Sequence, residues 1–221
     1  IYKSGGEMFW DSGNTGSATL NKNVTTYDAT IKHSGNYSAK LQSQYVALFG
    51  IGAFAAGNVF VGKFLKIDGT DGILRFGRPF TSRPSKLVLY YRYVAGTVDY
   101  STLSELPKNS KDMGSIYIAL GDWPHQTFEG ETDIPVLVKT KPADRQLFDS
   151  NSSNVIGYGE CILKESTEGE GLIKLEIPIN YRSNRKPTDI ILVGSASRYG
   201  DYFTGSTGST LWLDDLELIY E

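Results

Sequence analysis

The chain has 221 residues, of which 40% are apolar and 12% aromatic, and its formal net charge is −3. This size and apolar content suffice for one large domain or two small ones. No basic run is longer than the pair at residues 185–186. Nucleic acid and anionic membrane surfaces are therefore poor candidates as partners, because both require clustered cations.

No apolar run approaches the roughly 18 residues that a transmembrane helix needs. The single cysteine, Cys161, leaves no intrachain disulfide, and only His33 and His125 could act as its base. Packing on a strand is therefore favoured over thiol catalysis, and two histidines also argue against a histidine-rich zinc site. The start at Ile1 without a signal peptide fits a mature or trimmed fragment.

Helical periodicity is almost absent, and short runs rich in β-branched and aromatic residues predict strands along the whole chain. The predicted strands span residues 18–20, 25–33, 37–45, 58–67, 72–80, 86–95, 114–120, 134–139, 155–163, 171–179, 189–196 and 210–220. Their number and spacing predict a single all-β domain over residues 1–221. We expect a two-sheet antiparallel β-sandwich of the jelly-roll type, with a closed barrel as the alternative.

The segments between these strands include three long, irregular ones, at residues 97–112, 121–133 and 140–154, the last with a predicted helical turn at 143–148. Long loops on a rigid sandwich are where binding groups tend to lie. The small apolar segment 46–57 contains a Gly-x-Gly sequence, but neither a helix pattern nor Gly-Lys-Ser/Thr follows it. Close backbone packing is therefore favoured there over nucleotide binding.

The closing strand contains a fault in its alternation. Leu211 and Leu213 share one phase, whereas Leu216, Leu218 and Tyr220 share the other. A one-residue slip moves every side chain to the opposite face, so a continuous inward face requires a β-bulge at Asp214-Asp215. Two carboxylates at a bulge indicate either a solvated kink or a cation site. Calcium takes carboxylate and carbonyl ligands, so Asp214 and Asp215 are the candidate ligands of a structural calcium ion.

Aromatic side chains beside polar ones supply the candidate glycan-binding residues. Sugar rings stack their C–H faces on flat aromatic rings, and planar Arg or carboxylate groups bind their hydroxyls. Such pairings occur on the strand at 86–95, in two Trp-containing loops and in the Gly-rich loop at 198–203. The candidates are Trp10, Tyr90, Arg92, Trp123, Arg198, Tyr199, Asp201 and Tyr202. The alternative for each is a structural role, as a half-buried strand residue or as packing over an end of the sandwich.

Glycoside hydrolysis needs two carboxyl groups, about 5–5.5 Å apart for retention or about 6.5–9.5 Å for inversion. The candidates are Glu105, Asp112, Asp122, Glu129, Glu160, Asp201, Asp214 and Asp215. The sequence does not show which of these approach one another, and adjacent residues on a regular strand point to opposite faces. A serine nucleophile is disfavoured because the segment 194–197 lacks the Gly-x-Ser-x-Gly elbow. No catalytic residue is assigned.

The closing block SASRYGDYFTGSTGSTLWLDDLELIY resembles the C-terminal signature of the putative carbohydrate metabolism domain family. Earlier segments fit the same family in the same order: GNYSAKL, AAGNVFVGKF, FGRPFTSRP and LYYRYVAG. The resemblance covers most of the chain and implies a jelly roll similar to carbohydrate-binding modules, in surface or periplasmic proteins of Gram-negative gut anaerobes. Members have been called putative glycoside hydrolases, yet the resemblance maps no catalytic pair onto this chain.

The closing LDDLEL also resembles the last strand of several calcium-containing binding modules, in which a carboxylate of that strand helps to ligate the ion. We therefore expect a non-catalytic module that binds a polysaccharide or oligosaccharide at the cell envelope or outside the cell. Lipid anchoring through a missing N-terminal region is one expected route to that location. Two alternatives stay open: a glycoside hydrolase with an acidic residue pair, and a structural or adhesive envelope protein without a small ligand.

Overall fold

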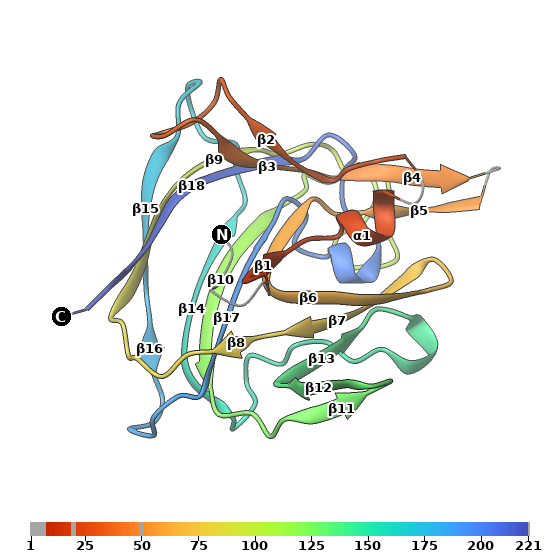
Figure 1. The fold of residues 1–221 in the computed structure, drawn as a ribbon. Coiled ribbons are helices and arrows are strands. Elements are labelled where there is room, and N and C mark those ends of the chain that lie inside the picture. The colour runs from red at the N-terminus through yellow and green to blue at the C-terminus, as the bar shows by residue number, and fades with distance from the viewer. Residues whose placement is uncertain (1–7, 19–20, 49–50, 221) are drawn as a thin grey trace.

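The runs of β-branched and aromatic residues form two facing antiparallel sheets in the computed structural model, which describes residues 8–18, 21–48 and 51–220 (Figure 1). The smaller sheet has the order β15 (Ile173–Pro178), β9 (Lys86–Val94), β18 (Thr210–Ile219), β3 (Ser38–Gln42) and β2 (Thr25–Asp28). Its alternating residues, such as Leu87 and Leu89, are buried against the larger sheet. The expected antiparallel β-sandwich is therefore confirmed, whereas the jelly-roll connectivity and the single-domain boundary stay predictions.

The larger sheet curls, so that it contributes to both the sandwich and one end of the molecule. Its order is β13 (Val136–Lys139), β7 (Asp71–Phe76), β6 (Asn58–Asp68), β17 (Asp189–Ser195), β10 (Gly114–Gly121), β14 (Val155–Leu163) and β16 (Asn180–Tyr181). Two further short strands pair with inner strands of this sheet. β1 (Trp10–Asp11) pairs with β6, and β8 (Arg78–Pro79) pairs with β17.

Strand β17 is buried on both faces, which explains its uninterrupted apolar sequence. Ile190 and Leu192 point into the core between the sheets. Ile191 and Val193 point into a second core on the other face, which the side chain of Phe148 helps to cover. The segment 140–154 therefore acts as a cover for the larger sheet and is not a free loop.

The β-bulge predicted in the closing strand is confirmed. The register between β18 and β9 shifts between Asp214 and Glu217, and Asp215 has a φ of 47°. Leu211 and Leu213 lie in the core before the bulge, and Leu216 packs against the same core after it. The extra residue thus restores the inward face that a regular strand would have lost.

Other expectations differ from the structure in detail. The apolar segment 46–57 is mostly a hairpin, β4 (Gln44–Leu48) with β5 (Ile51–Ala55), and the segment 121–133 contains a second, β11 (Gln126–Phe128) with β12 (Glu131–Ile134). The strand predicted at 37–45 breaks at Ser43, whose N–H donates to Ser209 O at 3.0 Å. Residues 19 and 20 of the strand predicted at 18–20 lie outside the described residues.

Helices are few and short. They are α1 (Asn14–Ser17) and the 3₁₀ turns η2 (Pro142–Asp144) and η3 (Gly200–Tyr202). The turn η2 overlaps only the start of the helical turn predicted at 143–148. Across the described ranges, no helix has the length and apolar content to cross a bilayer.

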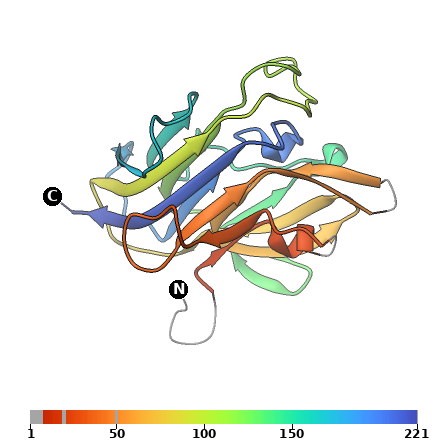
Figure 2. The same ribbon diagram turned by 90° about the horizontal axis from the view of Figure 1, so that it is seen from above.

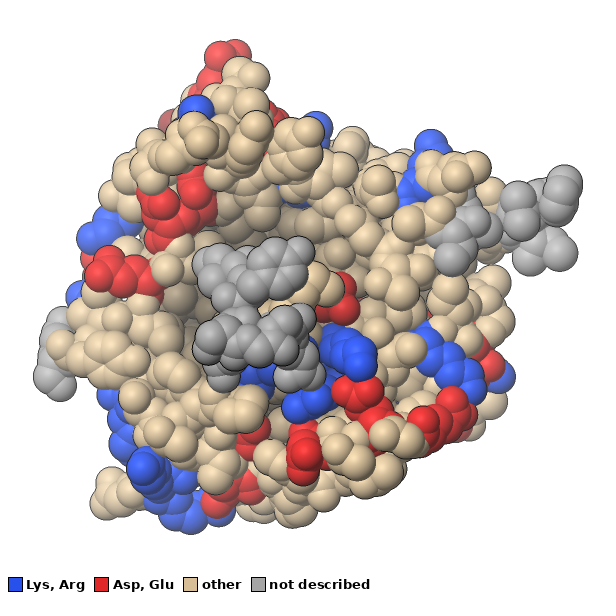
Figure 3. All heavy atoms as spheres, viewed as in Figure 1, with Lys and Arg blue, Asp and Glu red and all other residues tan. Residues whose placement is uncertain are grey.

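One end of the molecule is built by elements outside the regular sandwich. The hairpin β4–β5 extends past the sheets, and α1 lies beside it in both views (Figures 1 and 2). The hairpin β6–β7 reaches in the same direction below it (Figure 1). On the face shown in Figure 3, acidic and basic side chains are interspersed, without a broad basic patch.

Candidate functional site

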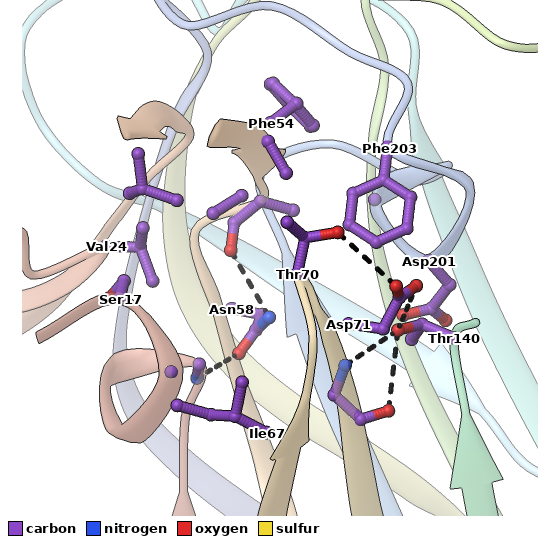
Figure 4. Close-up of a pocket in the computed structure, with 18 of the residues that line it drawn as sticks. Ser17, Val24, Phe54, Asn58, Ile67, Thr70, Asp71, Thr140, Asp201 and Phe203 are labelled. Carbon is purple, nitrogen blue, oxygen red and sulfur yellow. Dashed lines mark hydrogen bonds between the residues drawn. The ribbon is translucent and has the colours of Figure 1, made fainter. Parts of the chain in front are cut away.

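A cleft of about 450 Å³ opens between the hairpins β4–β5 and β6–β7, with α1 and η3 completing its walls (Figure 4). Its volume lies in the range of small-molecule sites in proteins. The cleft is lined by Gly13, Gly16, Ser17, Val24, Val46, Gly52, Ala53, Phe54, Ala55, Ala56, Asn58, Phe64, Ile67, Gly69, Thr70, Asp71, Gly72, Leu74, Thr140, Gly200, Asp201 and Phe203. Apolar side chains and small residues therefore make up most of the walls.

The tip of the hairpin β6–β7 presents one carboxylate to the cleft. Gly69, with a φ of 71°, makes the tight turn between the strands. Directly after it, Asp71 accepts hydrogen bonds from Thr70 Oγ1 and Thr140 Oγ1, each at 3.4 Å. Burial nevertheless raises the pKa of Asp71, because desolvation outweighs these two long hydrogen bonds.

The second carboxylate of the cleft, Asp201, belongs to the loop that carries η3. The buried Asp112 anchors that loop. Asp112 Oδ2 accepts hydrogen bonds from Ser197 Oγ at 2.6 Å and Ser209 Oγ at 2.7 Å, and from the backbone N–H of Ser206 at 2.8 Å. Asp112 has no exposed surface, and burial raises its pKa despite these partners. The loop over residues 197–209 is thus fixed near both ends.

Phe203 projects from this loop in an unusual backbone conformation. Its φ of 52° lies in the left-handed region, which bulky residues rarely adopt. The conformation caps η3, since the N–H of Phe203 donates to Gly200 O at 2.8 Å. Figure 4 shows the ring of Phe203 at the cleft, beside Asp201. The backbone conformation therefore aims an aromatic ring at the ligand space.

Asp201 is exposed, yet the pKa of its carboxyl is raised. The residue is exposed at the cleft, and within the described residues its carboxylate accepts no hydrogen bond. Protein atoms nevertheless crowd the carboxyl, and this desolvation raises its pKa to about 6, against an opposing effect of Arg145. The guanidinium of Arg145 lies 4.7 Å from the centre of the Tyr202 ring. Asp201 is thus available to a ligand.

Of the predicted glycan-binding residues, Asp201 lines the cleft, and its loop holds three others. Tyr199 and Tyr202 meet edge to face, with ring centres 6.4 Å apart. Arg198 forms an ion pair with Glu160, a residue of β14. Neither tyrosine nor Arg198 is among the residues that line the cleft.

The remaining predicted residues lie elsewhere and do not form one site. Trp123 is 8% exposed and packs edge to face on Phe148 in the second core. Trp10 packs against the core between the sheets. Tyr90 stacks on the His33 ring, and the Arg92 guanidinium lies 5.3 Å from the centre of the Trp212 ring. These four residues therefore have structural partners, and their part in glycan binding stays a prediction.

The bulge carboxylates interact with a neighbouring loop. Asp214 Oδ2 accepts hydrogen bonds from the N–H of His33 at 2.7 Å and of Ser34 at 3.3 Å. Asp215 contacts His33 Nδ1 at 2.7 Å and Ser34 Oγ at 2.9 Å, and these hydrogen bonds lower its pKa. Over residues 8–18, 21–48 and 51–220, no group of three or more His, Cys, Asp or Glu side chains could hold a metal ion. Calcium binding at Asp214 and Asp215 stays a prediction.

Sequence reasoning missed Asp71 and Ser17 as lining residues. The sequence pattern marks Asp71-Gly72 only as a turn, although an aspartate directly after a hairpin tip is well placed to face a neighbouring loop. Ser17 lies in a single helical turn that no periodic pattern indicates. Only the long-range packing of β6–β7 against η3 and α1 brings these side chains to one cleft.

The fold and the cleft together describe a β-sandwich domain with a ligand-sized site at one end. The family model "Putative carbohydrate metabolism domain" matches residues 2–219, and the chain belongs to this carbohydrate-related family. None of the curated proteins matches the chain significantly.

Two solved structures are similar to this chain over its whole length. A putative glycoside hydrolase from Bacteroides thetaiotaomicron VPI-5482 has a TM-score of 0.70 and 22% identity. This chain spans 66% of that protein, slightly less than two thirds. A putative glycoside hydrolase from Bacteroides vulgatus ATCC 8482 has a TM-score of 0.71 and 24% identity, and 89% of that protein is covered. At these identities the likeness shows the fold alone.

Proposed function

We propose that this chain is a non-catalytic carbohydrate-binding module and that its glycan site is the cleft between β4–β5 and β6–β7. The observation that carries the proposal is the pairing of Asp201 with Phe203. A carboxylate that accepts no hydrogen bond from the described residues lies beside an aromatic ring at the cleft. Sugars present hydroxyls to carboxylates and C–H faces to aromatic rings, so the two groups are complementary to one ligand class.

Membership of a carbohydrate-related family supports the same ligand class. The sandwich scaffold supports a preformed site, since sites on well-held elements retain their geometry without a ligand. We further propose a polysaccharide or oligosaccharide as the partner, and a location in the cell envelope or outside the cell. Lipid anchoring is a proposal of the same kind, and detection of the full-length protein in isolated membranes would test it.

Glycan-array binding tests this function. The wild-type chain, Asp201→Asn and the control Glu105→Gln should be compared, because Glu105 is an exposed carboxylate outside the cleft. We expect Asp201→Asn to weaken glycan binding about tenfold, which corresponds to losing one charged hydrogen bond, and the control to bind normally. Equal binding by Asp201→Asn would reject the site. Absence of binding by the wild-type chain would reject the function in favour of a structural or adhesive role.

A second candidate function is glycoside hydrolysis, which the shared cleft of Asp71 and Asp201 favours. Both side chains lie at the same end of the cleft (Figure 4), and burial raises the pKa of both. A general acid works best with a pKa near the operating pH, and a value of about 6 suits Asp201 for protonating a leaving oxygen. Asp71 would then activate water or attack the sugar.

Release of reducing ends from a polysaccharide panel separates the two functions. A hydrolase should release reducing ends, and Asp71→Asn and Asp201→Asn should each abolish this activity. A binding module should retain the same polysaccharides on affinity electrophoresis without degrading them. Degradation that survives both substitutions would show that the carboxylate pair is not catalytic.

A further inference from the structure

The walls of the cleft are more apolar than a site for an unmodified sugar requires. Its large side chains include Val24, Val46, Phe54, Phe64, Leu74 and Phe203. Val24 and Phe54 are almost completely buried in the chain alone, and Val46 and Leu74 are buried too. The walls of the cleft therefore consist mainly of apolar side chains and small residues, with few polar groups.

Most polar groups in the walls already have protein partners. Asn58 Oδ1 accepts a hydrogen bond from the N–H of Gly13 at 2.8 Å, and Asn58 Nδ2 donates to Ala56 O at 3.3 Å. Thr140 Oγ1 accepts from the N–H of Gly72 at 2.9 Å and donates to Asp71. These groups hold the hairpins in place and leave little hydrogen-bonding capacity for a ligand.

Two polar side chains of the walls have no hydrogen-bond partner among the described residues. Ser17 is 3% exposed, and its Oγ is buried with no hydrogen-bond partner among the described residues. Asp201 is exposed and likewise accepts no hydrogen bond from them. The two residues come from different walls, α1 and η3, as Figure 4 shows. A ligand can therefore form polar contacts at two separated points, with apolar contacts between them.

An aryl-substituted sugar fills such a space better than an unmodified sugar does. A pyranose carries a hydroxyl on most of its ring carbons, and each buried hydroxyl without a partner costs roughly 1–3 kcal/mol. An aryl ring has no such requirement. Packing against Phe203 would also add favourable ring–ring contacts.

From these observations we propose that the cleft binds the aryl group of an aryl-substituted sugar. This inference rests on the carbohydrate function proposed above and narrows its ligand class. The aryl group fills the apolar space that Phe203 borders, and the attached sugar lies at the opening, where Asp201 accepts hydrogen bonds from its hydroxyls. Ser17 Oγ donates to a polar substituent on the aryl group, or accepts from it.

Matched glycosides test the proposal. Calorimetric titration of the complete chain should compare para-nitrophenyl and methyl glycosides of glucose, galactose, xylose and arabinose, with para-nitrophenol as the sugar-free probe. For at least one sugar we expect the para-nitrophenyl glycoside to bind more than about tenfold tighter than the methyl glycoside. This factor is modest for a buried ring, since each 1.4 kcal/mol of binding free energy corresponds to about tenfold.

Two variants assign the effect to the cleft. Phe203→Ala should reduce the preference for the aryl glycoside by about tenfold, whereas the matched control Phe128→Ala should retain it. Phe128 is also half-buried but packs in a different cluster. Thermal unfolding of both variants verifies folding. If Phe203→Ala does not fold, Val46→Ser provides the same test, because Val46 lines another wall.

The outcomes distinguish failure of this inference from failure of the proposed carbohydrate function. Equal binding of the aryl and methyl glycosides would reject the inference and leave the carbohydrate function intact. An aryl preference that Phe203→Ala and Val46→Ser do not change would also reject it. Equal binding of para-nitrophenol and its glycosides would reject the carbohydrate function and leave only an apolar cavity. Absence of binding by all probes would reject both.

Discussion

Asp214 and Asp215 are neighbours in the chain, whereas Asp71 and Asp201 are far apart in sequence and lie at one cleft. The bulge pair accepts hydrogen bonds from the loop at His33, which lower the pKa of Asp215. In the cleft pair, desolvation by surrounding protein atoms raises the pKa of both carboxyls, although the Asp201 residue is exposed as a whole. The contrast shows that proximity in sequence is a poor guide to function here. Of these four carboxylates, only Asp201 accepts no hydrogen bond from the described residues, and folding places it at the cleft beside Asp71.

The strongest test of this contrast removes the anchor of the cleft loop. In Asp112→Ala, the buried hydroxyls of Ser197 and Ser209 and the N–H of Ser206 lose their acceptor. Leaving such groups unsatisfied should lower the free energy of unfolding by about 3 kcal/mol. Urea denaturation measures this loss, with Glu105→Ala as the exposed control. A loss below about 1 kcal/mol would show that the loop has another anchor.

The next largest effect is expected at the bulge. The double substitution Asp214→Ala and Asp215→Ala removes the acceptors for His33 and Ser34, and should destabilise the fold by about 1.5 kcal/mol because these partners are partly exposed. Glycan binding should not change. The pKa of Asp215 is below its usual 3.8, so its stabilisation is present above pH 3.8 and is lost as the pH falls through the lower folded value.

Urea denaturation of the wild type and the double variant near pH 7 and near pH 3 checks the size of the destabilisation and the direction in which it changes with pH. A difference from wild type that grows at low pH would contradict the role given to Asp215. Weaker glycan binding by the double variant would remove the distinction between the two aspartate pairs. Calcium titration of the wild type belongs to the same experiment, because ion-dependent stabilisation that the double variant lacks would support the predicted calcium site.

A smaller effect is expected from the backbone of Phe203. Left-handed geometry costs a residue with a side chain about 1 kcal/mol relative to glycine, so Phe203→Gly should be about 1 kcal/mol more stable than Phe203→Ala. Both variants lack the ring and should bind ligand equally weakly. Paired urea denaturation and binding curves test this expectation. Equal stability of the two variants would show that the conformation carries no strain.

The smallest effect is the pH dependence at Asp201. Its folded pKa of about 6 exceeds the usual 3.8, so ionisation opposes folding; the destabilisation is absent below pH 3.8 and complete above about pH 6. Asp201→Asn should therefore be more stable than wild type above pH 6, by less than about 1 kcal/mol because the residue is exposed. The difference should shrink as the pH falls towards 4. Thermal unfolding of both proteins from pH 4 to 8 would contradict this if the difference were constant.

The sandwich and the bulge could be predicted because both depend on the local alternation of apolar and polar residues along the strands. The phase change around Asp214 requires an extra residue wherever the partner strands lie. The family signature in the closing block likewise indicates carbohydrate chemistry from the sequence alone. These inferences depend on short stretches of sequence, which is why they were accurate.

The cleft could not be predicted in the same way, because it forms from contacts between distant segments. Asp201 was a candidate through its aromatic loop, but nothing in the sequence pairs it with Asp71 or Ser17. Trp123 illustrates the opposite difficulty. A tryptophan between polar residues suggests an exposed platform, and the segment that carries Phe148 buries it instead. Burial of a loop residue depends on what folds over it, which local sequence does not contain.

The anchoring of the loop at Asp112 has a consequence for how this domain can diversify. Ser197 on one side of η3, and Ser206 and Ser209 on the other, are tied to a single buried carboxylate. The two ends of this loop are therefore held independently of the side chains of Asp201 and Phe203. Substitutions at Asp201 and Phe203 should therefore change which ligand the cleft accepts while the loop keeps its attachment to Asp112.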